Sequence, residues 1–352
     1  MNIDDLAKRA GEWLSGTGPM SDIVISSRIR LARNVAGFPF LGKATEGQRA
    51  ELQRMLREHI EQLGLPDPTF YVDIEDTGEL DRRVLVERHL ISRQQAEGVG
   101  SRGVAISSRE TLALMVNEED HLRIQDLRSG LQLDELWQEI SRVDDMLGSR
   151  LDYAFHNRYG YLTACPTNVG TGIRVSVMLH LPALRMTGEM ERVIRAARDM
   201  RLAIRGLYGE GTEATGDFYQ VSNQTTLGRS EEEIIDDFKH IVIPKIIDYE
   251  KQARQLLTQE KAVILDDKIW RAYGLLSTAR ALSTDEALAL LSHLRMGIHL
   301  GRIDRLGMDM VNELFVLTQP AHLQKLRGAD LDGEARSAAR AEYVRRRLGG
   351  EN

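Results

Sequence analysis

The spacing of apolar residues changes near residue 230, and this change limits the folds that the chain can adopt. Before residue 230, stretches with an apolar residue at every second position alternate with helical stretches. Beyond it, the apolar spacing is helical almost to the end. With 352 residues, of which 42% are hydrophobic, the chain is long enough for two domains with separate cores. We therefore predict an α+β domain over residues 1–252 and an all-helical domain over residues 253–352.

In the first domain, the predicted strands and helices follow one another without a regular order. The apolar spacing predicts helices over residues 48–63, 134–147 and 188–204, and strands over residues 70–74, 104–107, 111–117, 161–164 and 173–181. In the last of these strands, Ile173, Val175 and Val177 share one face, and Arg174 lies on the other. Because the helices fall irregularly among the strands, an antiparallel sheet flanked by helices is favoured over a doubly wound parallel sheet.

Helix starts are marked by a hydroxyl residue that is followed three positions later by Gln or Glu, the capping-box pattern. Three such pairs are Thr45 with Gln48, Ser230 with Glu233, and Ser283 with Glu286. The helix that begins after Ser230 contains Pro244, which should bend it. Further helices are predicted over residues 268–282, 284–300 and 308–317.

The composition argues against several classes of protein. The net charge of −7 disfavours non-specific binding to nucleic acid or to an anionic membrane. No apolar run is long enough to span a bilayer, and the N-terminus lacks the apolar core of a signal peptide. The single cysteine, Cys165, cannot form an internal disulfide. We therefore expect a soluble protein of a reducing cytoplasm.

Two arginines stand close together in the segment SSRIRLAR, residues 26–33. In an extended strand, Arg28 and Arg30 point to one face, while Ile29 and Leu31 point to the other. Neighbouring arginines repel each other, so they need acidic partners opposite or an anion between them. Arginine is suited to bidentate contact with phosphate. The pattern is thus compatible with a solvated sheet face paired to acids and with a phosphate site.

The acidic segment NEEDHLR, residues 117–123, follows an apolar strand. Three consecutive acids often form only a turn, but in an extended chain Glu119 and Arg123 would share a face. A carboxylate beside a phosphate-binding arginine is a catalytic arrangement. On its own, this motif is only a weak indication of a catalytic site.

Two further segments combine glycines with residues capable of chemistry. In CPTNVGTGIR, residues 165–174, the glycines could let backbone amides approach an anion, although Gly-x-Gly is common in turns. Cys165 would by default be a small buried hydrophobe. In RGLYGEGTE, residues 205–213, Arg205 and Glu210 lie in a Gly-rich loop. Such a loop could close on a substrate or be an ordinary surface loop.

Taken together and in this order, the segments resemble those of the phosphagen (guanidino) kinases, the family of creatine kinase and arginine kinase. The matching stretches are VISSRIRLARN, VNEEDHLRI, YLTACPTNVGTGIRVSV and RGLYGEGTEATGDFYQVSN, between residue 21 and about residue 250. The resemblance implies that residues 1–252 form a catalytic domain that uses ATP and Mg²⁺. It implies five arginines that bind the ATP phosphates: Arg28, Arg30, Arg123, Arg174 and Arg205.

The resemblance also assigns the residues on the acceptor side. We expect no metal-ligating residues in the protein. Glu119 is implied to act on the acceptor guanidinium, Glu210 to be a second substrate carboxylate, and Cys165 to lie beside the guanidinium. A guanidinium has a pKa above ~12 and no free lone pair, so it is a poor nucleophile. Two carboxylates can hold it, aim one nitrogen and take up a proton. A Cys165 thiolate stabilised by nearby cations could help to polarise the group.

Two differences from the phosphagen kinases favour one branch of the family. Only twenty residues precede Ser21, where phosphagen kinases have a helical domain of about a hundred residues that closes over a small substrate. In exchange, the chain has the helical region 253–352. This architecture resembles the bacterial protein-arginine kinases, so we expect the acceptor to be an arginine exposed on another protein. The alternatives are a kinase for free arginine and an inactive adaptor that binds phosphoarginine proteins; the presence of all five arginines and both glutamates disfavours the adaptor.

The resemblance further implies a role in the bacterial stress response. Phosphoarginine would mark aberrant proteins for a Clp chaperone–protease, a zinc-binding activator would stimulate the kinase, and a heat-shock repressor would be among its substrates. A homodimer is compatible with the sequence.

Protein-arginine kinases also have an Arg-Asp-x-x-Arg motif that forms an allosteric phosphoarginine pocket. Its best counterpart here is Arg336, Ser337 and Arg340, with serine in place of the aspartate. Charge-assisted hydrogen bonds contribute ~1.5–3 kcal/mol, against ~0.5–1.5 kcal/mol for neutral ones. We therefore expect phosphoarginine to bind this pocket about tenfold more weakly than a pocket that has the aspartate. The alternative is a basic, solvated terminal helix, since three further arginines follow at 345–347.

Overall fold

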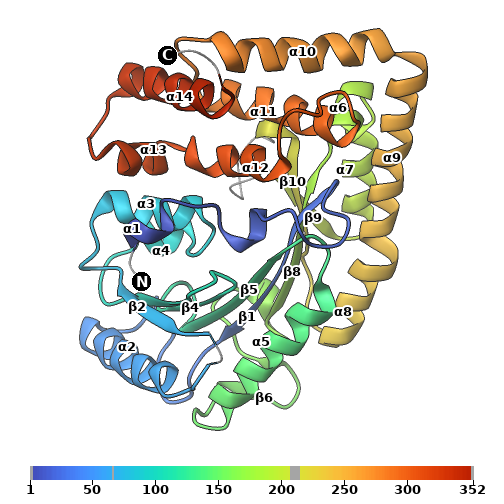
Figure 1. The fold of residues 1–352 in the computed structure, drawn as a ribbon. Helices are drawn as coiled ribbons and strands as arrows, with labels where there is room; N and C mark the ends of the chain where they lie inside the picture. Colours follow the sequence, from blue (N-terminus) through green and yellow to red (C-terminus); the bar gives the residue numbers. More distant parts are fainter. Residues whose placement is uncertain (1–2, 66, 207–214, 350–352) are drawn as a thin grey trace.

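The computed structural model describes residues 3–65, 67–206 and 215–349 of the chain. Within them, eight strands form one antiparallel sheet in the order β2-β3-β4-β5-β1-β8-β10-β9, which confirms the predicted α+β class (Figure 1). The strands are β1 (Val24–Arg33), β2 (Thr69–Asp73), β3 (Gly103–Ser107), β4 (Leu112–Val116), β5 (Leu122–Ser129), β8 (Ile173–His180), β9 (Leu202–Arg205) and β10 (Phe218–Asn223). A separate hairpin consists of β6 (Phe155–His156) and β7 (Gly160–Tyr161).

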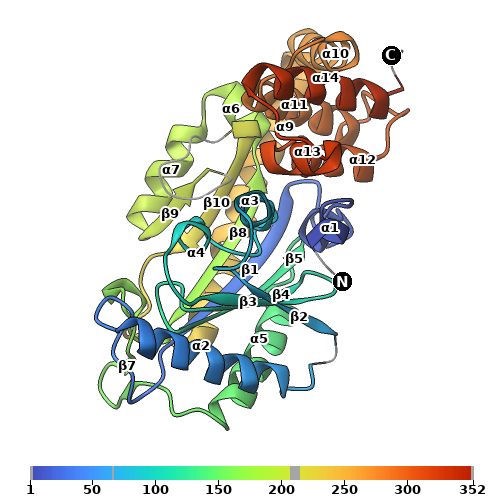
Figure 2. The same cartoon turned by 90° about the vertical axis from the view of Figure 1, so that its left-hand side faces the viewer.

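Helices surround this sheet and form the whole C-terminal region. Those of the first part are α1 (Ile3–Leu6), α2 (Glu46–Glu61), α3 (Glu79–Glu87), α4 (Arg93–Glu97), α5 (Leu133–Gly148), α6 (Pro182–Thr187), α7 (Met190–Asp199), α8 (Glu231–Asp237) and α9 (Ile243–Glu260). The C-terminal helices are α10 (Ala262–Thr278), α11 (Thr284–His299), α12 (Met308–Leu317), α13 (Pro320–Arg327) and α14 (Gly333–Arg347). In Figure 1 these five lie together above the sheet, and Figure 2 shows them again at one end of it.

Strand β1 lies at the centre of the sheet, between β5 and β8. Its residues Ile29 and Leu31 are fully buried and share the core with Leu136 and Ile140 of α5, which packs on β1 and β5. Each such side chain contributes about 1.5–3 kcal/mol through burial. Because side chains alternate along a strand, the same packing turns Arg28 and Arg30 to the opposite face of the sheet.

Two of the predicted capping boxes are confirmed in full. The Thr45 and Ser230 side chains each accept the backbone N–H three residues ahead, and Gln48 and Glu233 return the bond. At the start of α11, the Ser283 hydroxyl accepts the Glu286 N–H. These bonds satisfy backbone donors that the first turn of a helix leaves without a partner.

Some element boundaries differ from the sequence prediction. The helix predicted over 188–204 ends at Asp199, because Arg201 has a left-handed φ of 55° and the next residues pair with β10 as strand β9. Of the strand predicted over 161–164, only Tyr161 lies in a strand, the two-residue β7. Pro244 lies in the first turn of α9, directly after a π-helical turn, Phe238–Val242. The predicted domain boundary at residue 253 lies within α9 and stays a prediction.

No helix among the residues that the structure describes is long and apolar enough to cross a membrane.

Asp126 is an unusual member of the core, since it is a fully buried carboxylate on β5. Arg128 Nη2 lies 3.5 Å from Asp126 Oδ2. Burial raises the pKa of Asp126 to about 7, and the nearby Arg128 only partly opposes this rise. Between the ordinary carboxyl pKa and this value, the folded protein therefore binds more protons than the unfolded chain. The free energy of unfolding consequently falls as the pH rises through this window.

We predict that Asp126→Asn reduces the loss of unfolding free energy between pH 5 and pH 8 by about 1–3 kcal/mol, because the neutral amide does not ionise. Urea unfolding at four pH values between these limits measures the effect, with the exposed Asp330→Asn as the control. Parallel stability curves for the wild type and Asp126→Asn would contradict this account of Asp126.

Candidate active site

A cavity of about 940 Å³ lies over the face of the sheet that presents Arg28 and Arg30. Its lining includes Glu119, Cys165 and all five arginines assigned from the sequence: Arg28, Arg30, Arg123, Arg174 and Arg205. Glu210 lies outside the described residues. The fold thus brings together every residue of the expected main site that the structure describes, although these residues are spread over 178 positions of the chain, from 28 to 205.

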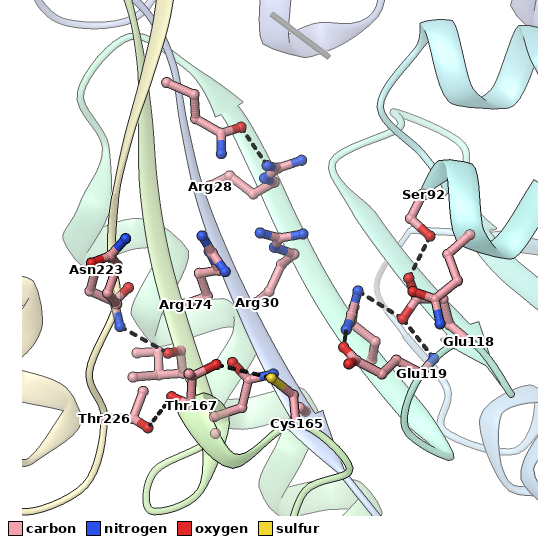
Figure 3. A pocket seen from close by; sticks show the side chains of 18 of the residues that line it. Arg28, Arg30, Ser92, Glu118, Glu119, Cys165, Thr167, Arg174, Asn223 and Thr226 are labelled. Carbon is pink, nitrogen blue, oxygen red and sulfur yellow. Dashed lines mark hydrogen bonds and ion pairs between the residues drawn. The ribbon is translucent and has the colours of Figure 1, made fainter. Parts of the chain in front are cut away.

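Three of the arginines project from two neighbouring strands. Arg30 on β1 lies directly opposite Arg174 on β8 in the ladder, and Arg28 lies two residues along. Figure 3 shows the three side chains entering the same space. Arg28 donates to Gln220 Oε1 at 2.7 Å and to Ser176 Oγ at 3.3 Å, and Arg174 donates to Ser222 Oγ at 3.0 Å. The partners of Arg28 are neutral, so they orient its guanidinium group without neutralising the charge.

Burial and the proximity of other cations lower the pKa of Arg28 and Arg30. Although both side chains keep some contact with solvent in the cavity, burial lowers the pKa of Arg28 to about 10 and that of Arg30 well below its ordinary value. Repulsion from Arg123 and Arg174 lowers the pKa of both further. Clustered like charges in a region of low dielectric constant are stabilised by an opposite charge. The cluster therefore favours a multiply charged anion.

Arg123 is fixed by the acidic turn between β4 and β5. Its Nη1 lies 2.7 Å from Glu118 Oε2, and its Nη2 lies 2.9 Å from Glu119 Oε2. Glu118 is buried and also accepts the Ser92 hydroxyl at 2.5 Å and the Glu119 N–H at 2.7 Å. Glu118 thus holds the arginine, the turn and the start of α4 together.

Glu119 is placed differently from its neighbour, because its side chain is one-third exposed to the cavity. Burial raises the pKa of Glu119, and this effect exceeds the lowering by the ion pair with Arg123. A carboxylate with a raised pKa is a stronger base, and it is better matched to proton transfer near neutral pH. The geometry therefore suits Glu119 to accept a proton from a group in the cavity.

Asp120 connects this turn to the segment that contains Cys165. One oxygen of the buried Asp120 carboxylate accepts the Ala164 N–H and the Asn34 amide, each at 2.7 Å. Cys165 is partly exposed at the cavity wall, with its Sγ 3.0 Å from Thr167 Oγ1. The default expectation of a buried hydrophobic cysteine is therefore wrong.

The glycines after Cys165 act through the backbone. Gly172 has a φ of +65°, and a Cβ at this position would lie 2.6 Å from the Ala32 carbonyl oxygen. Only glycine fits this close approach of β8 to β1. The approach brings Arg174 alongside Arg30.

Sequence reasoning missed several residues of the cavity. Ser92, Gln220, Asn223 and Thr226 are among the lining residues; Gln220 and Asn223 fall within the stretch RGLYGEGTEATGDFYQVSN, but the resemblance assigned no role to them. Glu118 was inside the acidic segment, and its place beside Glu119 was the signal that could have marked it.

The residues of the expected allosteric pocket lie on α14, outside this lining. Arg340 is buried and donates to the carbonyl oxygens of Thr318 at 2.7 Å and Leu282 at 2.8 Å. Arg336 donates to the Leu331 carbonyl at 2.7 Å, and the Ser337 hydroxyl donates to the Gly333 carbonyl at 2.9 Å. A phosphoarginine pocket at this motif stays a prediction.

Two family models together match most of the chain. Residues 51–253 match the ATP:guanido phosphotransferase C-terminal catalytic domain, and residues 262–352 match the protein-arginine kinase McsB C-terminal domain. The chain is 48% identical over 352 residues to a protein-arginine kinase of Symbiobacterium thermophilum, with 99% of each chain covered. It is 44% identical over 349 residues to a protein-arginine kinase of Halothermothrix orenii, again with 99% of each covered.

Solved structures share the fold over most of the chain. The duplicated taurocyamine kinase from Schistosoma mansoni, solved with bound transition-state-analogue components, has a TM-score of 0.60 at 28% identity, over 71% of this chain and 36% of that one. Lombricine kinase has a TM-score of 0.58 at 26% identity, over 71% and 75%. Together with the full-length sequence matches, these likenesses show that the chain belongs to the protein-arginine kinase family of guanidino phosphotransferases.

Proposed function

We propose that the protein transfers the γ-phosphoryl group of ATP to arginine side chains of other proteins and so forms phosphoarginine. The observation that supports this most is the shared cavity, which is lined by five arginines and by the carboxylate of Glu119. Such a cavity can hold a polyphosphate on one side and a cationic acceptor on the other. Phosphoryl transfer requires mainly that both be positioned and that the developing charge be stabilised.

On the nucleotide side, the arginines bind the phosphates and neutralise their charge. Arg28, Arg30 and Arg174 provide forked N–H groups from rigid strands, and these match the geometry of phosphate oxygens. Mg²⁺ enters as the Mg–ATP substrate and supplies further neutralisation of the phosphates. Mg²⁺ held by phosphates typically needs only one or two carboxylates from the protein. Of the two carboxylates among the described lining residues, Glu118 is buried against Arg123, so Glu119 is the one that could contact Mg²⁺ held by the phosphates.

On the acceptor side, Glu119 holds the guanidinium group and takes one of its protons. As the new N–P bond forms, the bond between the γ-phosphorus and the bridging oxygen breaks, and ADP leaves with that electron pair. The proton lost from the attacking nitrogen passes to Glu119, whose raised pKa suits this role. We propose Glu210 as a second carboxylate for the guanidinium and Cys165 as a group that polarises it.

The similarity of residues 262–352 to the C-terminal domain of protein-arginine kinases supports a protein as the acceptor. The named relatives, which match over nearly their full length, support the same choice. We further propose that the protein works in the bacterial cytoplasm with a zinc-binding activator, that it can form a homodimer, and that its product is a signal for Clp degradation. The phosphoryl transfer described above does not depend on these partners.

The acceptor class can be tested directly. The protein is incubated with Mg–ATP and either an unfolded protein or free arginine, and acid-labile, alkali-stable phosphate is measured in each. We expect this phosphate on the protein. Phosphate transferred to free arginine but not to the protein would overturn the proposed acceptor.

Glu119→Ala should lower turnover by about 10²–10⁴-fold, because the variant loses both the base and an orienting contact. The affinity for Mg–ATP, measured by calorimetry, should stay close to that of the wild type. Glu58→Ala on the exposed face of α2 is the matched control and should leave turnover unchanged. Near wild-type turnover of Glu119→Ala on a protein substrate is incompatible with the assigned role.

Arg174→Lys should weaken Mg–ATP binding by about tenfold, which corresponds to ~1.4 kcal/mol. The lysine keeps the positive charge but replaces a planar fork by a point charge, and it cannot reproduce bidentate contact. The exposed Arg271→Lys on α10 is the control. Equal affinity of Arg174→Lys and the wild type would show that Arg174 does not contact the phosphates as proposed.

A further inference from the structure

A buried chain of hydrogen bonds joins α11 to the sheet and to α6, away from the cavity. Arg295 Nη1 lies 2.9 Å from His180 Nδ1, and His180 Nε2 lies 2.9 Å from Ser292 Oγ. Ser292 Oγ lies 2.5 Å from Asp217 Oδ2, and Arg185 Nη1 donates to Asp217 Oδ1 at 2.8 Å. Four of the five side chains are buried, and Arg185 at the end of the chain reaches solvent.

Chemistry fixes the direction of each bond in this chain. A guanidinium group only donates, so His180 Nδ1 must accept from Arg295, and the ring proton is on Nε2. His180 Nε2–H then donates to Ser292 Oγ, and the Ser292 hydroxyl donates to Asp217. Burial, with repulsion from Arg295 and Arg254, holds the pKa of His180 well below its ordinary value, so the ring is neutral.

The direction of the bonds excludes one interpretation of this cluster. Serine, histidine and aspartate also form the nucleophilic triad of hydrolases, in which the histidine accepts the proton of the serine. Here the nitrogen that faces Ser292 already bears a proton, so His180 cannot act as that base. This series of hydrogen bonds therefore orients the side chains that it joins and does not activate a nucleophile.

The hydrogen bonds orient the Gly216–Asp217 turn, whose backbone has an unfavourable conformation. Gly216 and Asp217 both have left-handed φ values, of 69° and 59°. Such a conformation costs a residue other than glycine roughly 1–3 kcal/mol and persists only where its surroundings enforce it. A Cβ on Gly216 would lie 3.2 Å from the Leu288 carbonyl oxygen of α11. Helix α11 thus packs against the first residue of the turn and hydrogen-bonds the second.

The position of this turn links it to the candidate active site. It directly precedes β10, and in both Figure 1 and Figure 2 the upper end of β10 meets the C-terminal helices. Gln220 of β10 orients Arg28 and lies opposite Arg205 in the ladder with β9.

We propose that Ser292 is a positioning residue, through which the C-terminal helices fix the Gly216–Asp217 turn and thereby strand β10, whose Gln220 orients Arg28 in the active site. The inference rests on the proposed kinase function and assigns to the C-terminal region a contribution to turnover without contact to either substrate. It accounts for a buried, directed chain of polar groups that links α11 to the strand next to the arginines.

The central test is Ser292→Ala, which removes the hydroxyl that joins His180 to Asp217. We expect kcat on a protein substrate to fall by about 10–100-fold, since a small misplacement of reacting groups can cost about 10²-fold. The affinity for Mg–ATP should change by less than about twofold, because the phosphate-binding arginines lie on strands other than β10 and keep their backbone positions. Asp217→Asn, which tolerates the left-handed backbone but lacks the charge, should lower kcat in the same direction by a smaller factor.

Ser277→Ala is the matched control. The Ser277 hydroxyl on α10 has no hydrogen-bond partner among the described residues, so its loss should change neither kcat nor affinity. Amide hydrogen exchange over residues 218–223 provides a readout that does not depend on activity. We expect faster exchange there in Ser292→Ala and Asp217→Asn, and wild-type exchange in Ser277→Ala.

These readouts separate failure of the inference from failure of the proposed function. A wild type that phosphorylates no protein would overturn the function, and the exchange comparison would still decide whether Ser292 fixes the turn. Wild-type kcat or unchanged exchange in Ser292→Ala would overturn the inference. Equal losses of kcat, Mg–ATP affinity and thermal stability would also overturn it, because they indicate a general structural role. If Ser292→Ala does not fold, Asp217→Asn is judged by the same outcomes.

Discussion

Repulsion among arginines on one face of a sheet is the constraint on which the rest of this site depends. Arg28, Arg30 and Arg174 lie on adjacent strands, and burial together with repulsion from the neighbouring cations lowers the pKa of Arg28 and Arg30. The apolar face of the same strands packs with α5 in the hydrophobic core, and the free energy gained by this burial offsets the repulsion. The charge is therefore held in place by packing on the opposite side, and a bound polyphosphate would relieve the repulsion.

The acidic groups around the cavity divide into those that hold the site and one that is open to it. Glu118 is buried against Arg123 and Ser92, and Asp120 ties the same turn to the segment with Cys165. Glu119 is left partly exposed between them, with a raised pKa. Three consecutive acids thus have three different environments. Burial and partners, rather than residue type, make Glu119 the one suited to chemistry.

The sequence allowed part of this arrangement to be predicted, because alternation along a strand is local. The faces of Arg28, Arg30 and Arg174 followed from their spacing, and the roles of the arginines and glutamates came from the family resemblance. The register that places Arg30 opposite Arg174 depends on which distant strands pair. The bond from Ser92 to Glu118 crosses 26 positions and has no signal in the sequence. Likewise, the apolar residues keep a helical spacing past Asp199, but residues 202–205 pair with β10 and form strand β9.

The central claim is that the arginine cluster is a polyphosphate site, and a crystal structure with Mg²⁺ and a non-hydrolysable ATP analogue tests it most directly. The account predicts phosphate oxygens within hydrogen-bonding distance of Arg28, Arg30, Arg123, Arg174 and Arg205, and a γ-phosphate that faces Glu119. Phosphates bound elsewhere, or a nucleotide in this cavity whose phosphates point away from these arginines, would contradict it.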